Sequence, residues 1–216
     1  MNTAVRPAII IASTSPRRRA LLSQAGIEFM TVGVEIDESW LAGESADAYI
    51  RRMVMTKADA VMADATLPSE CIVITADTIG VLDDGEVLTK PVDQADAYRM
   101  WDRLSDTTHE IWTAVCLTRL SQGERMDQQY LCERTEVEFI KLSDADKASY
   151  WQTGEPQDKA GAYAIQGGAA AWVSAIRGSY TNVVGLPLAQ VVQKIKAMQG
   201  LAVANDKPNN HHNNKP

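Results

Sequence analysis

The chain has 216 residues, of which 45% are hydrophobic, so it can bury the core of one large domain or of two small lobes. Its formal net charge of −7 and its pI near 5.0 argue against a broad nucleic-acid-binding surface. We expect a cytoplasmic protein, because there is no membrane-spanning apolar run and no signal-peptide pattern, and the three widely spaced cysteines are typical of free thiols.

The first predicted elements are a short buried strand and a helix. The β-branched run at residues 9–11 predicts the strand. Ser15 is a good N-cap residue, and Pro16 suits the first helical position because proline has no backbone N–H to leave unpaired. The helix should end near Ala25, since Gly26 is a typical residue to follow a helix.

Three arginines occupy the first turn of this helix. Arg17, Arg18 and Arg19 have the wrong sign for that position, because the helix dipole places partial positive charge at its N-terminus. A solvated basic turn is the ordinary explanation of such a run. The strand, the serine-proline start and the helix together favour an alternative, in which an anion binds the free N–H groups and the arginine side chains. Arg19 is expected to point away, since three consecutive residues cannot share one helical face.

The rest of the pattern mixes helices and strands along the whole length, with both crossovers and hairpins. This mixture predicts an α/β protein with a mixed sheet. In chain order we expect a strand at 27–36, a loop at 37–45, a helix at 45–63, a strand at 71–82, a turn and short return at 83–91, a helix at 93–104, strands at 110–120 and 128–140, a helix at 143–152, a strand, glycine turn and strand within 162–178, and a helix at 187–198.

The domain organisation is predicted to be simple. Residues 1–200 read as a single domain without internal repeats, and the Asn-rich stretch at 201–216 reads as a disordered tail. Of the three histidines, His211 and His212 fall in that tail and His109 opens a predicted strand. The sequence therefore offers no material for a Ser-His-Asp triad or a histidine-rich metal centre.

Lys57 interrupts the apolar stripe of the second helix. Ile50, Met53, Val54 and Val61 follow helical spacing on one face, and Lys57 falls on the same face. A lysine in this place commonly extends its ammonium to the edge of the core. The alternative is that this face borders a polar cleft in which Lys57 reaches an anion.

Asp77 interrupts a second apolar pattern. It stands in a nearly all-apolar strand, where a carboxylate needs a charge partner or a metal. A structural ion pair would satisfy it, but Lys90 follows just past a hairpin turn and can reach the same place. We therefore favour a functional role for Asp77, as general base or metal ligand.

An acidic pair precedes the second helix. Asp37 and Glu38 lie in the predicted loop, where such residues are usually just solvated. Beside a phosphate site they can help to hold Mg²⁺, which binds through one or two carboxylates and the substrate phosphates. There is no Walker motif in the sequence, so P-loop chemistry is excluded.

Four stretches resemble the Maf family of nucleoside triphosphate pyrophosphatases. They are ASTSPRRRALLSQAGIEF, ITADTIGVLDDGEVLTKP, DKAGAYAIQG and GSYTNVVGLPL, in the family's order between residues 9 and 195. The resemblance implies two lobes of an elongated mixed sheet with flanking helices around a cleft, related to the inosine-triphosphatase fold. It also implies hydrolysis of a nucleoside triphosphate, dTTP or UTP in the branch that the sequence is most similar to, with a divalent metal (Mg²⁺ or Mn²⁺). A homodimer is a further implication.

The resemblance also assigns roles by position. Asp77 matches the family's proton acceptor on the metal side, and Glu38 matches an acidic metal-side position. The remaining matches are Arg17, Thr78 and Gln166 at positions linked to base specificity, and Ser13, Arg18, Lys57 and Lys90 at phosphate-side positions.

Two alternatives stand beside this interpretation. One is a 7-methyl-GTP pyrophosphatase of the same family, and the other is a nucleotide-binding regulator, for instance of septum formation. Asp77 favours an enzyme over a regulator, because a pure binding module needs no positioned base. Asp106 and Ala164 stand where the family usually has glycine, which concerns loop geometry and not the chemistry.

Overall fold

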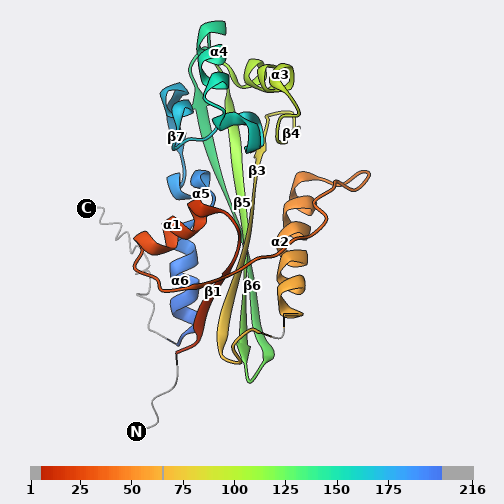
Figure 1. Cartoon of the computed structure of the whole chain (residues 1–216), viewed down its shortest axis with the longest axis vertical. Coiled ribbons are helices and arrows are strands. Elements are labelled where there is room, and N and C mark those ends of the chain that lie inside the picture. The colour runs from red at the N-terminus through yellow and green to blue at the C-terminus, as the bar shows by residue number, and fades with distance from the viewer. Residues whose placement is uncertain (1–5, 65, 201–216) are drawn as a thin grey trace, which may run out of the picture.

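The computed structural model describes residues 6–64 and 66–200, and the predicted tail lies outside them. In the described residues, seven strands form one mixed sheet in the order β2-β1-β3-β5-β6-β7, with β4 paired to β3 (Figure 1). The predicted α/β class with a mixed sheet is confirmed. The strands are β1 (Ala8–Ala12), β2 (Met30–Val32), β3 (Cys71–Val81), β4 (Val87–Leu88), β5 (Thr108–Ser121), β6 (Glu124–Phe139) and β7 (Val173–Arg177).

Three long antiparallel strands give the molecule its length. β3, β5 and β6 contain 11, 14 and 16 residues and run side by side through both halves of the molecule (Figure 1). At about 3.3 Å per residue, β6 alone spans roughly 50 Å. β1 joins the lower half in parallel with both β2 and β3, whereas β7 pairs with β6 in the upper half. The two halves are therefore parts of the same sheet.

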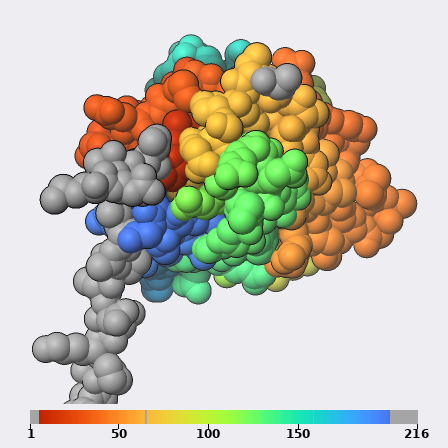
Figure 2. Space-filling model, turned by 90° about the horizontal axis from the view of Figure 1, so that it is seen from below, coloured from red at the N-terminus to blue at the C-terminus, as the bar shows by residue number. Residues whose placement is uncertain are grey.

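Helices cover both faces of the sheet. In the lower half, α1 (Pro16–Gln24) and α6 (Leu188–Met198) lie on one face and α2 (Ala46–Met62) on the other (Figures 1 and 2). The upper half carries α3 (Gln94–Leu104), α4 (Asp144–Gln152) and the 3₁₀ turns η1 (Glu155–Asp158), η2 (Ala160–Ala162) and η3 (Gly168–Trp172). The short α5 (Tyr180–Val184) lies between the halves. No helix among these residues is long and apolar enough to cross a membrane.

Among the described α-helices, α2, α3, α4 and α5 begin with a side-chain capping hydrogen bond, whereas α1 and α6 do not. The side chain of Ser45 accepts a hydrogen bond from a backbone N–H of α2, and Ser143 forms a capping box with Asp146. Ser15 occupies the N-cap position of α1, but its side chain makes no capping hydrogen bond. Its backbone N–H donates instead to Ser13 Oγ at 3.2 Å. The start of α1 thus depends on Pro16 and on the turn before it.

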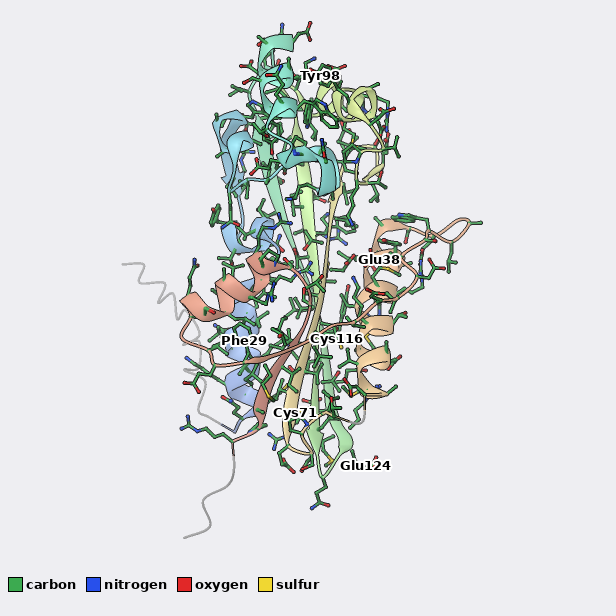
Figure 3. All side chains as sticks on the ribbon, in the orientation of Figure 1. Phe29, Glu38, Cys71, Tyr98, Cys116 and Glu124 are labelled. Atoms are coloured by element: carbon green, nitrogen blue, oxygen red, sulfur yellow. The ribbon has the colours of Figure 1, made fainter. Side chains whose placement is uncertain are left out.

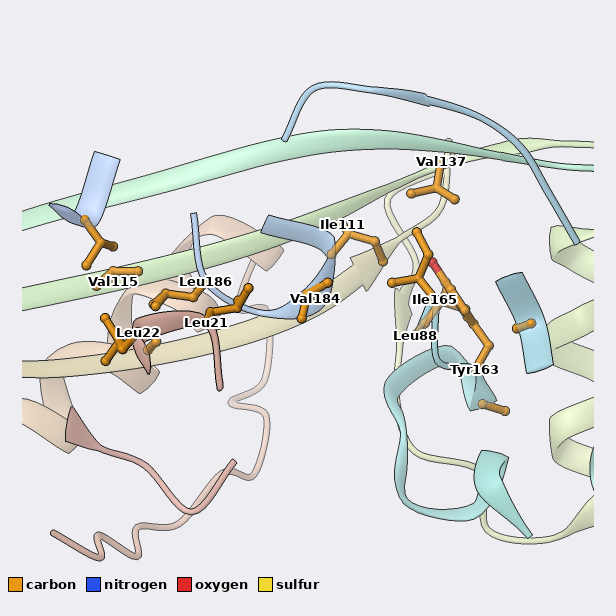
Figure 4. Packing of buried hydrophobic residues seen from close by; sticks show 14 of the residues in the cluster. Leu21, Leu22, Leu88, Ile111, Val115, Val137, Tyr163, Ile165, Val184 and Leu186 are labelled. Carbon is orange, nitrogen blue, oxygen red and sulfur yellow. The ribbon is translucent and has the colours of Figure 1, made fainter. Parts of the chain in front are cut away.

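One apolar cluster extends through both halves. In the lower half Leu22 of α1 packs near Leu186, and in the upper half Tyr163 and Ile165 belong to the same buried cluster (Figure 4). A second cluster, which includes Met53, fills the space between α2 and the opposite face of β3 and β5. Because both clusters pack on the same long strands, the two halves are held together by one sheet.

Two predicted strands are wrong. β2 covers only Met30–Val32 instead of residues 27–36, because β1 offers it partners only at Ile10, Ile11 and Ala12. The predicted strand at the start of 162–178 forms a turn between η2 and η3. Its alternation reflects the burial of Tyr163 and Ile165 against the core and not pairing with a neighbouring strand. The short helix α5 was not among the predicted elements.

Candidate active site

The candidate site lies beside a part of β3 that has no neighbouring strand on one side. All of β3 pairs with β5 on one side, so β1 and β4 share the other side of β3. β1 pairs with β3 as far as Thr75, and β4 pairs with it from Gly80 onward. Among the described residues, 76–79 of β3 therefore have no neighbouring strand on that side. A cleft of about 730 Å³ opens at this gap, lined by residues from both halves.

All nine predicted site residues line this cleft. Asp37 and Arg19, which also stood out in the sequence, do not line the cleft. Asp37 is exposed and its carboxylate accepts the backbone N–H of Ser39 at 2.9 Å, while Arg19 donates to the carbonyl of Thr14 at 3.2 Å. Arg19 thus points away as predicted. The nine are Ser13, Arg17, Arg18, Glu38, Lys57, Asp77, Thr78, Lys90 and Gln166.

Asp77 and Thr78 bring opposite faces of the sheet to the cleft. They are adjacent in β3, and successive side chains of a strand point to opposite faces. The carboxylate of Asp77 meets Lys57 of α2, whereas the hydroxyl of Thr78 meets Arg18 of α1. Because no strand covers this edge, a ligand in the gap can contact both sides at once.

On the α2 side, Lys57 lies between two carboxylates. Its Nζ is 2.7 Å from Asp77 Oδ1 and 2.7 Å from Glu38 Oε1, and the three side chains are 10%, 15% and 50% exposed. Lys57 thus does not extend to the surface: it faces a polar cleft, where its nearest anions belong to the protein. Burial raises the pKa of Glu38, but the hydrogen bond and charge of Lys57, with the charges of Lys90 and Arg18, outweigh it and leave the pKa below its usual value. Glu38 is therefore a carboxylate at neutral pH.

Contacts with α2 hold the loop that carries Glu38. Tyr49 Oη donates to the carbonyl of Glu38 at 3.0 Å, and Trp40 stacks on Tyr49 with 4.0 Å between the ring centroids. Burial is the main cause that raises the pKa of Tyr49 to about 12, so its hydroxyl remains a donor. Arg52 pairs with Glu44 at 2.6 Å at the far end of the loop. These contacts fix the backbone of Glu38 against the helix that supplies Lys57.

On the other side, Arg18 is held by three elements. Its Nε donates to the carbonyl of Gly185 at 2.8 Å, Nη1 to Ser13 Oγ at 3.3 Å and Nη2 to Thr78 Oγ1 at 3.0 Å. Burial lowers the pKa of Arg18, against an opposite effect of Asp77, but an arginine remains charged in a protein. The guanidinium is thus an oriented positive charge at the start of α1.

A relay of hydroxyl groups continues from Arg18 into the sheet. Thr113 Oγ1 donates to the carbonyl of Asn182 at 3.0 Å, so the 2.9 Å contact between Thr78 and Thr113 has Thr78 as its donor. Thr78 accepts from Arg18 at the same time. The hydroxyl hydrogen of Thr78 is therefore used in the hydrogen bond to Thr113. Thr78 can only accept a hydrogen bond from a ligand.

Three longer side chains complete the lining. Arg17 lines the cleft without a hydrogen bond to another described residue, so its guanidinium is available to a ligand. Lys90, just after β4, and Gln166, in the turn before η3, are exposed and line the wall formed by the upper half. The cleft thus has cationic groups on both walls.

Some cleft residues escaped the sequence analysis. Trp40 and Tyr49 line the cleft but were read only as part of a loop and a helix. A tryptophan in a polar loop was the available signal, since a large aromatic ring there needs a partner. Tyr163 also lines the cleft, and the false strand pattern at 162–178 hid its role.

The donor set suits a hard divalent cation. No group of three or more histidine, cysteine or acidic side chains able to hold a metal occurs in residues 6–64 and 66–200. Asp77 and Glu38 supply two carboxylates within reach of one ammonium group. Mg²⁺ commonly binds through one or two carboxylates and completes its shell with water and substrate phosphates. The residues present therefore fit a metal that arrives with a phosphorylated ligand.

The chain is similar in sequence to known proteins over most of its length. The chain is 50% identical to the dTTP/UTP pyrophosphatase of Psychrobacter cryohalolentis, over 88% of this chain and 96% of that protein. It is 47% identical to the dTTP/UTP pyrophosphatase of Shewanella denitrificans, over 88% of this chain and 95% of that protein. A solved nucleoside-triphosphatase / dITP/XTP pyrophosphatase from Mycobacterium abscessus is similar at 16% identity and a TM-score of 0.39, over 61% of this chain and 74% of that one, which is too weak to carry an argument.

The family comparison covers nearly all of the described residues. The sequence pattern of the family described as Maf-like protein matches residues 8–198, from the first strand to the last helix. With this match and relatives of about half identical sequence, the chain belongs to the Maf-like protein family.

Proposed function

We propose that this protein is a pyrophosphatase that hydrolyses dTTP and UTP to the monophosphate and pyrophosphate. One observation carries the proposal: Asp77 presents a carboxylate at the open edge of β3, in a cleft that also contains Arg17, Arg18, Lys57 and Lys90. The relatives named dTTP/UTP pyrophosphatase support the substrate class. Such a reaction takes place in the cytoplasm, where nucleoside triphosphates are made and used.

The triphosphate binds between the two cationic walls. Arg18 and the start of α1 supply fixed positive charge on one side, and Lys90 supplies a side chain free to fold over the phosphates. The charge on the phosphates neutralises the run of arginines at the helix start. This explains three positive charges at a position where acidic residues are usual.

Asp77 accepts the proton of the attacking water. Lys57 holds Asp77 Oδ1 at 2.7 Å, which orients the carboxylate and leaves its other oxygen toward the cleft. As water attacks the α-phosphorus, the bond from that phosphorus to the bridging oxygen breaks, and pyrophosphate leaves with the bridging oxygen. The cationic side chains stabilise the negative charge that develops on the phosphates. A metal held by Asp77 and Glu38 would polarise the water and neutralise phosphate charge when bound.

Gln166 selects the base. A side-chain amide offers one donor and one acceptor, and uracil and thymine present an acceptor O4 beside a donor N3–H. Guanine presents the same pair at O6 and N1–H, but it carries an exocyclic amine donor where uracil and thymine have the acceptor O2. An unpaired buried polar group costs roughly 1–3 kcal/mol, enough to rank substrates. With Gln166 paired to the edge that these bases share, the exocyclic amine of guanine is the group left unpaired, which favours UTP and dTTP over GTP and 7-methyl-GTP.

Pyrophosphate release over a nucleotide panel tests the proposal. The purified protein is given UTP, dTTP, GTP and 7-methyl-GTP in turn, with Mg²⁺ or Mn²⁺, and kcat/KM is measured for each. UTP and dTTP are expected to be the best substrates. A preference for 7-methyl-GTP would exclude this branch of the family but keep the pyrophosphatase activity. No pyrophosphate from any nucleotide would favour the alternative of a nucleotide-binding regulator.

A further inference from the structure

The turn that carries Gln166 is held at both ends by side chains from outside the cleft. The backbone N–H of Ala164 donates to Tyr150 Oη at 3.0 Å, and that of Gly168 donates to Glu155 Oε2 at 3.0 Å. Within the turn, the N–H of Gly167 donates to the carbonyl of Ala164 at 3.0 Å. Gln166 thus projects into the cleft from a segment fixed on both sides.

Glu155 and Gly167 fit against each other without spare room. A Cβ added at Gly167 would lie 1.8 Å from Glu155 Oε1 and 2.1 Å from Oε2. The φ angle of Gly167 is −111°, which other residues also adopt, so the carboxylate and not the backbone conformation excludes a side chain here. Glycine at this position allows the turn to approach the carboxylate closely.

Tyr150 and Glu155, the two side chains that hold the turn, differ in their other contacts. Tyr150 is buried and packs against Trp101 and Trp172, so it also belongs to the core of the upper half. Glu155 is half-buried at the start of η1, and its carboxylate meets the turn at Gly168. The hydroxyl of Tyr150 also donates to the carboxylate of Glu155. Removing that carboxylate therefore frees the Gly168 end of the turn and takes one partner from the Tyr150 hydroxyl, while the ring of Tyr150 keeps its aromatic contacts in the core.

We propose that Glu155 is a positioning residue for base selection, acting through the backbone of the turn that carries Gln166. This inference rests on the proposed function, in which Gln166 reads the base. A paired donor and acceptor tolerate only a small displacement, so a turn that moves by an ångström loses the match. The residues inferred to hold the phosphates lie on α1, on α2 and after β4, and none of them touches Glu155.

The first experiment compares Glu155→Ala with Glu155→Gln. Glu155→Ala is expected to reduce the ratio of kcat/KM for UTP to that for CTP by about tenfold or more, because cytosine presents a donor and an acceptor in the reverse order to uracil. Glu155→Gln keeps an oxygen that can accept from Gly168 and should stay within about threefold of the wild type. Inorganic tripolyphosphate has no base, so its inhibition constant should be unchanged in both variants. Glu124→Ala, which removes an exposed carboxylate at the far end of the β5–β6 hairpin (Figure 3), is the matched control.

Two outcomes would overturn the inference: an unchanged ratio in Glu155→Ala, or an equal loss for nucleotides and tripolyphosphate. Thermal unfolding establishes that each variant is folded. If the wild-type enzyme prefers another base, the proposed substrate is wrong, but the inference is still tested on whichever base ranking the wild type has. A failure of the proposed substrate preference is thus distinguishable from a failure of the proposed role of Glu155.

A double-mutant cycle tests the contact itself. Gly167→Ala alone should flatten the base ranking, because the new Cβ displaces the carboxylate. In the Glu155→Ala background the three atoms nearest to the new Cβ are absent, so the same substitution should add little and the two effects are expected to be strongly non-additive. If the two substitutions changed the base ranking additively, the contact between Glu155 and Gly167 would not influence base selection, and the proposal would be overturned.

Discussion

Asp77 and Thr78 are neighbours in one strand, yet they meet different chemistry. Asp77 shares Lys57 with a second carboxylate, and the hydroxyl of Thr78 donates a hydrogen bond to Thr113 while it accepts one from Arg18. Alternation along a strand separates the proposed base from the fixed cation by the thickness of the sheet. The two residues thus have different hydrogen-bond partners, although the charge of Asp77 still acts on Arg18 across the strand.

Substitution of Asp77 tests the proposed base. Asp77→Asn keeps the size and the polar contact to Lys57 but removes the group that accepts a proton. A general base typically contributes about 10²–10⁴-fold, so we expect a loss of kcat in that range with nucleotide binding largely retained. Pyrophosphate release and calorimetric nucleotide binding measure the two quantities. Near-wild-type turnover at saturating metal would mean that Asp77 is not the base.

Lys57 supplies the second prediction at this scale. Its ammonium sits 2.7 Å from both carboxylates, where it competes with any cation that binds them. Lys57→Met should therefore bind Mn²⁺ about tenfold more tightly in the absence of nucleotide, and hydrolyse nucleotides more slowly. Free Mn²⁺ followed by electron paramagnetic resonance gives the affinity, with Lys141→Met as a control of equal charge change. Unchanged or weaker Mn²⁺ binding would contradict the competition.

At the scale of elements, α5 connects the site to the sheet. Asn182 is fully buried, and its Nδ2 donates to the carbonyl of Ile111 and to Thr135 Oγ1, both at 2.9 Å. The same helix ends at Gly185, whose carbonyl orients Arg18. This five-residue helix is thus held by polar groups as well as by Val183 and Val184, which pack in the apolar cluster.

We expect Asn182→Ala to destabilise the protein. The substitution leaves the carbonyl of Ile111 buried without its partner, and each such group costs roughly 1–3 kcal/mol. The free energy of unfolding in urea should fall by about that amount, and Arg18 should lose part of its orientation, which lowers kcat/KM. Ser174→Ala, which removes an exposed hydroxyl on β7, is the control. A change below about 0.5 kcal/mol would mean that α5 is held by other contacts.

Predictability from the sequence differed between elements for physical reasons. Strand β3 and helix α2 could be predicted because both are long and strongly patterned, and Asp77 and Lys57 were visible as breaks in those patterns. The gap at residues 76–79 could not, since it depends on where β1 and β4 stop pairing. The turn at 164–168 was misread because alternating burial looks the same whether or not a strand pairs. The role of Glu155 had no local signal, as its partner lies at Gly168.

At the scale of the whole molecule, the sheet joins both halves, and a buried histidine links the strands of the upper half to the cleft. His109 of β5 is 1% exposed, and its Nε2 lies 2.7 Å from Oη of Tyr163, which lines the cleft. Burial lowers the pKa of His109 to about 4. The folded protein therefore keeps this imidazole neutral at pH values where an unfolded chain would protonate it.

This difference predicts a loss of stability in acid. An unfolded histidine has a pKa of about 6.5, so the unfolded state binds more protons than the folded state between pH 6.5 and about 4. The free energy of unfolding should fall through this window by up to about 3 kcal/mol as the pH is lowered. His109→Leu should lack this component, so its stability deficit relative to wild type should shrink from pH 7 to pH 4. Parallel urea-unfolding profiles for the two proteins over this range would contradict the assignment.

The gap in the sheet also depends on where two strands end. β1 is followed by Ser13, Thr14, Ser15 and Pro16, and β4 is followed by Thr89, Lys90 and Pro91. Proline cannot donate to a ladder, so each segment meets a residue that discourages a longer strand. Further pairing from either side would add hydrogen bonds along residues 76–79 and cover the proposed base. Selection for stability and selection for activity thus act in opposite directions on the lengths of β1 and β4, and the shortness of these two strands is what keeps the cleft open.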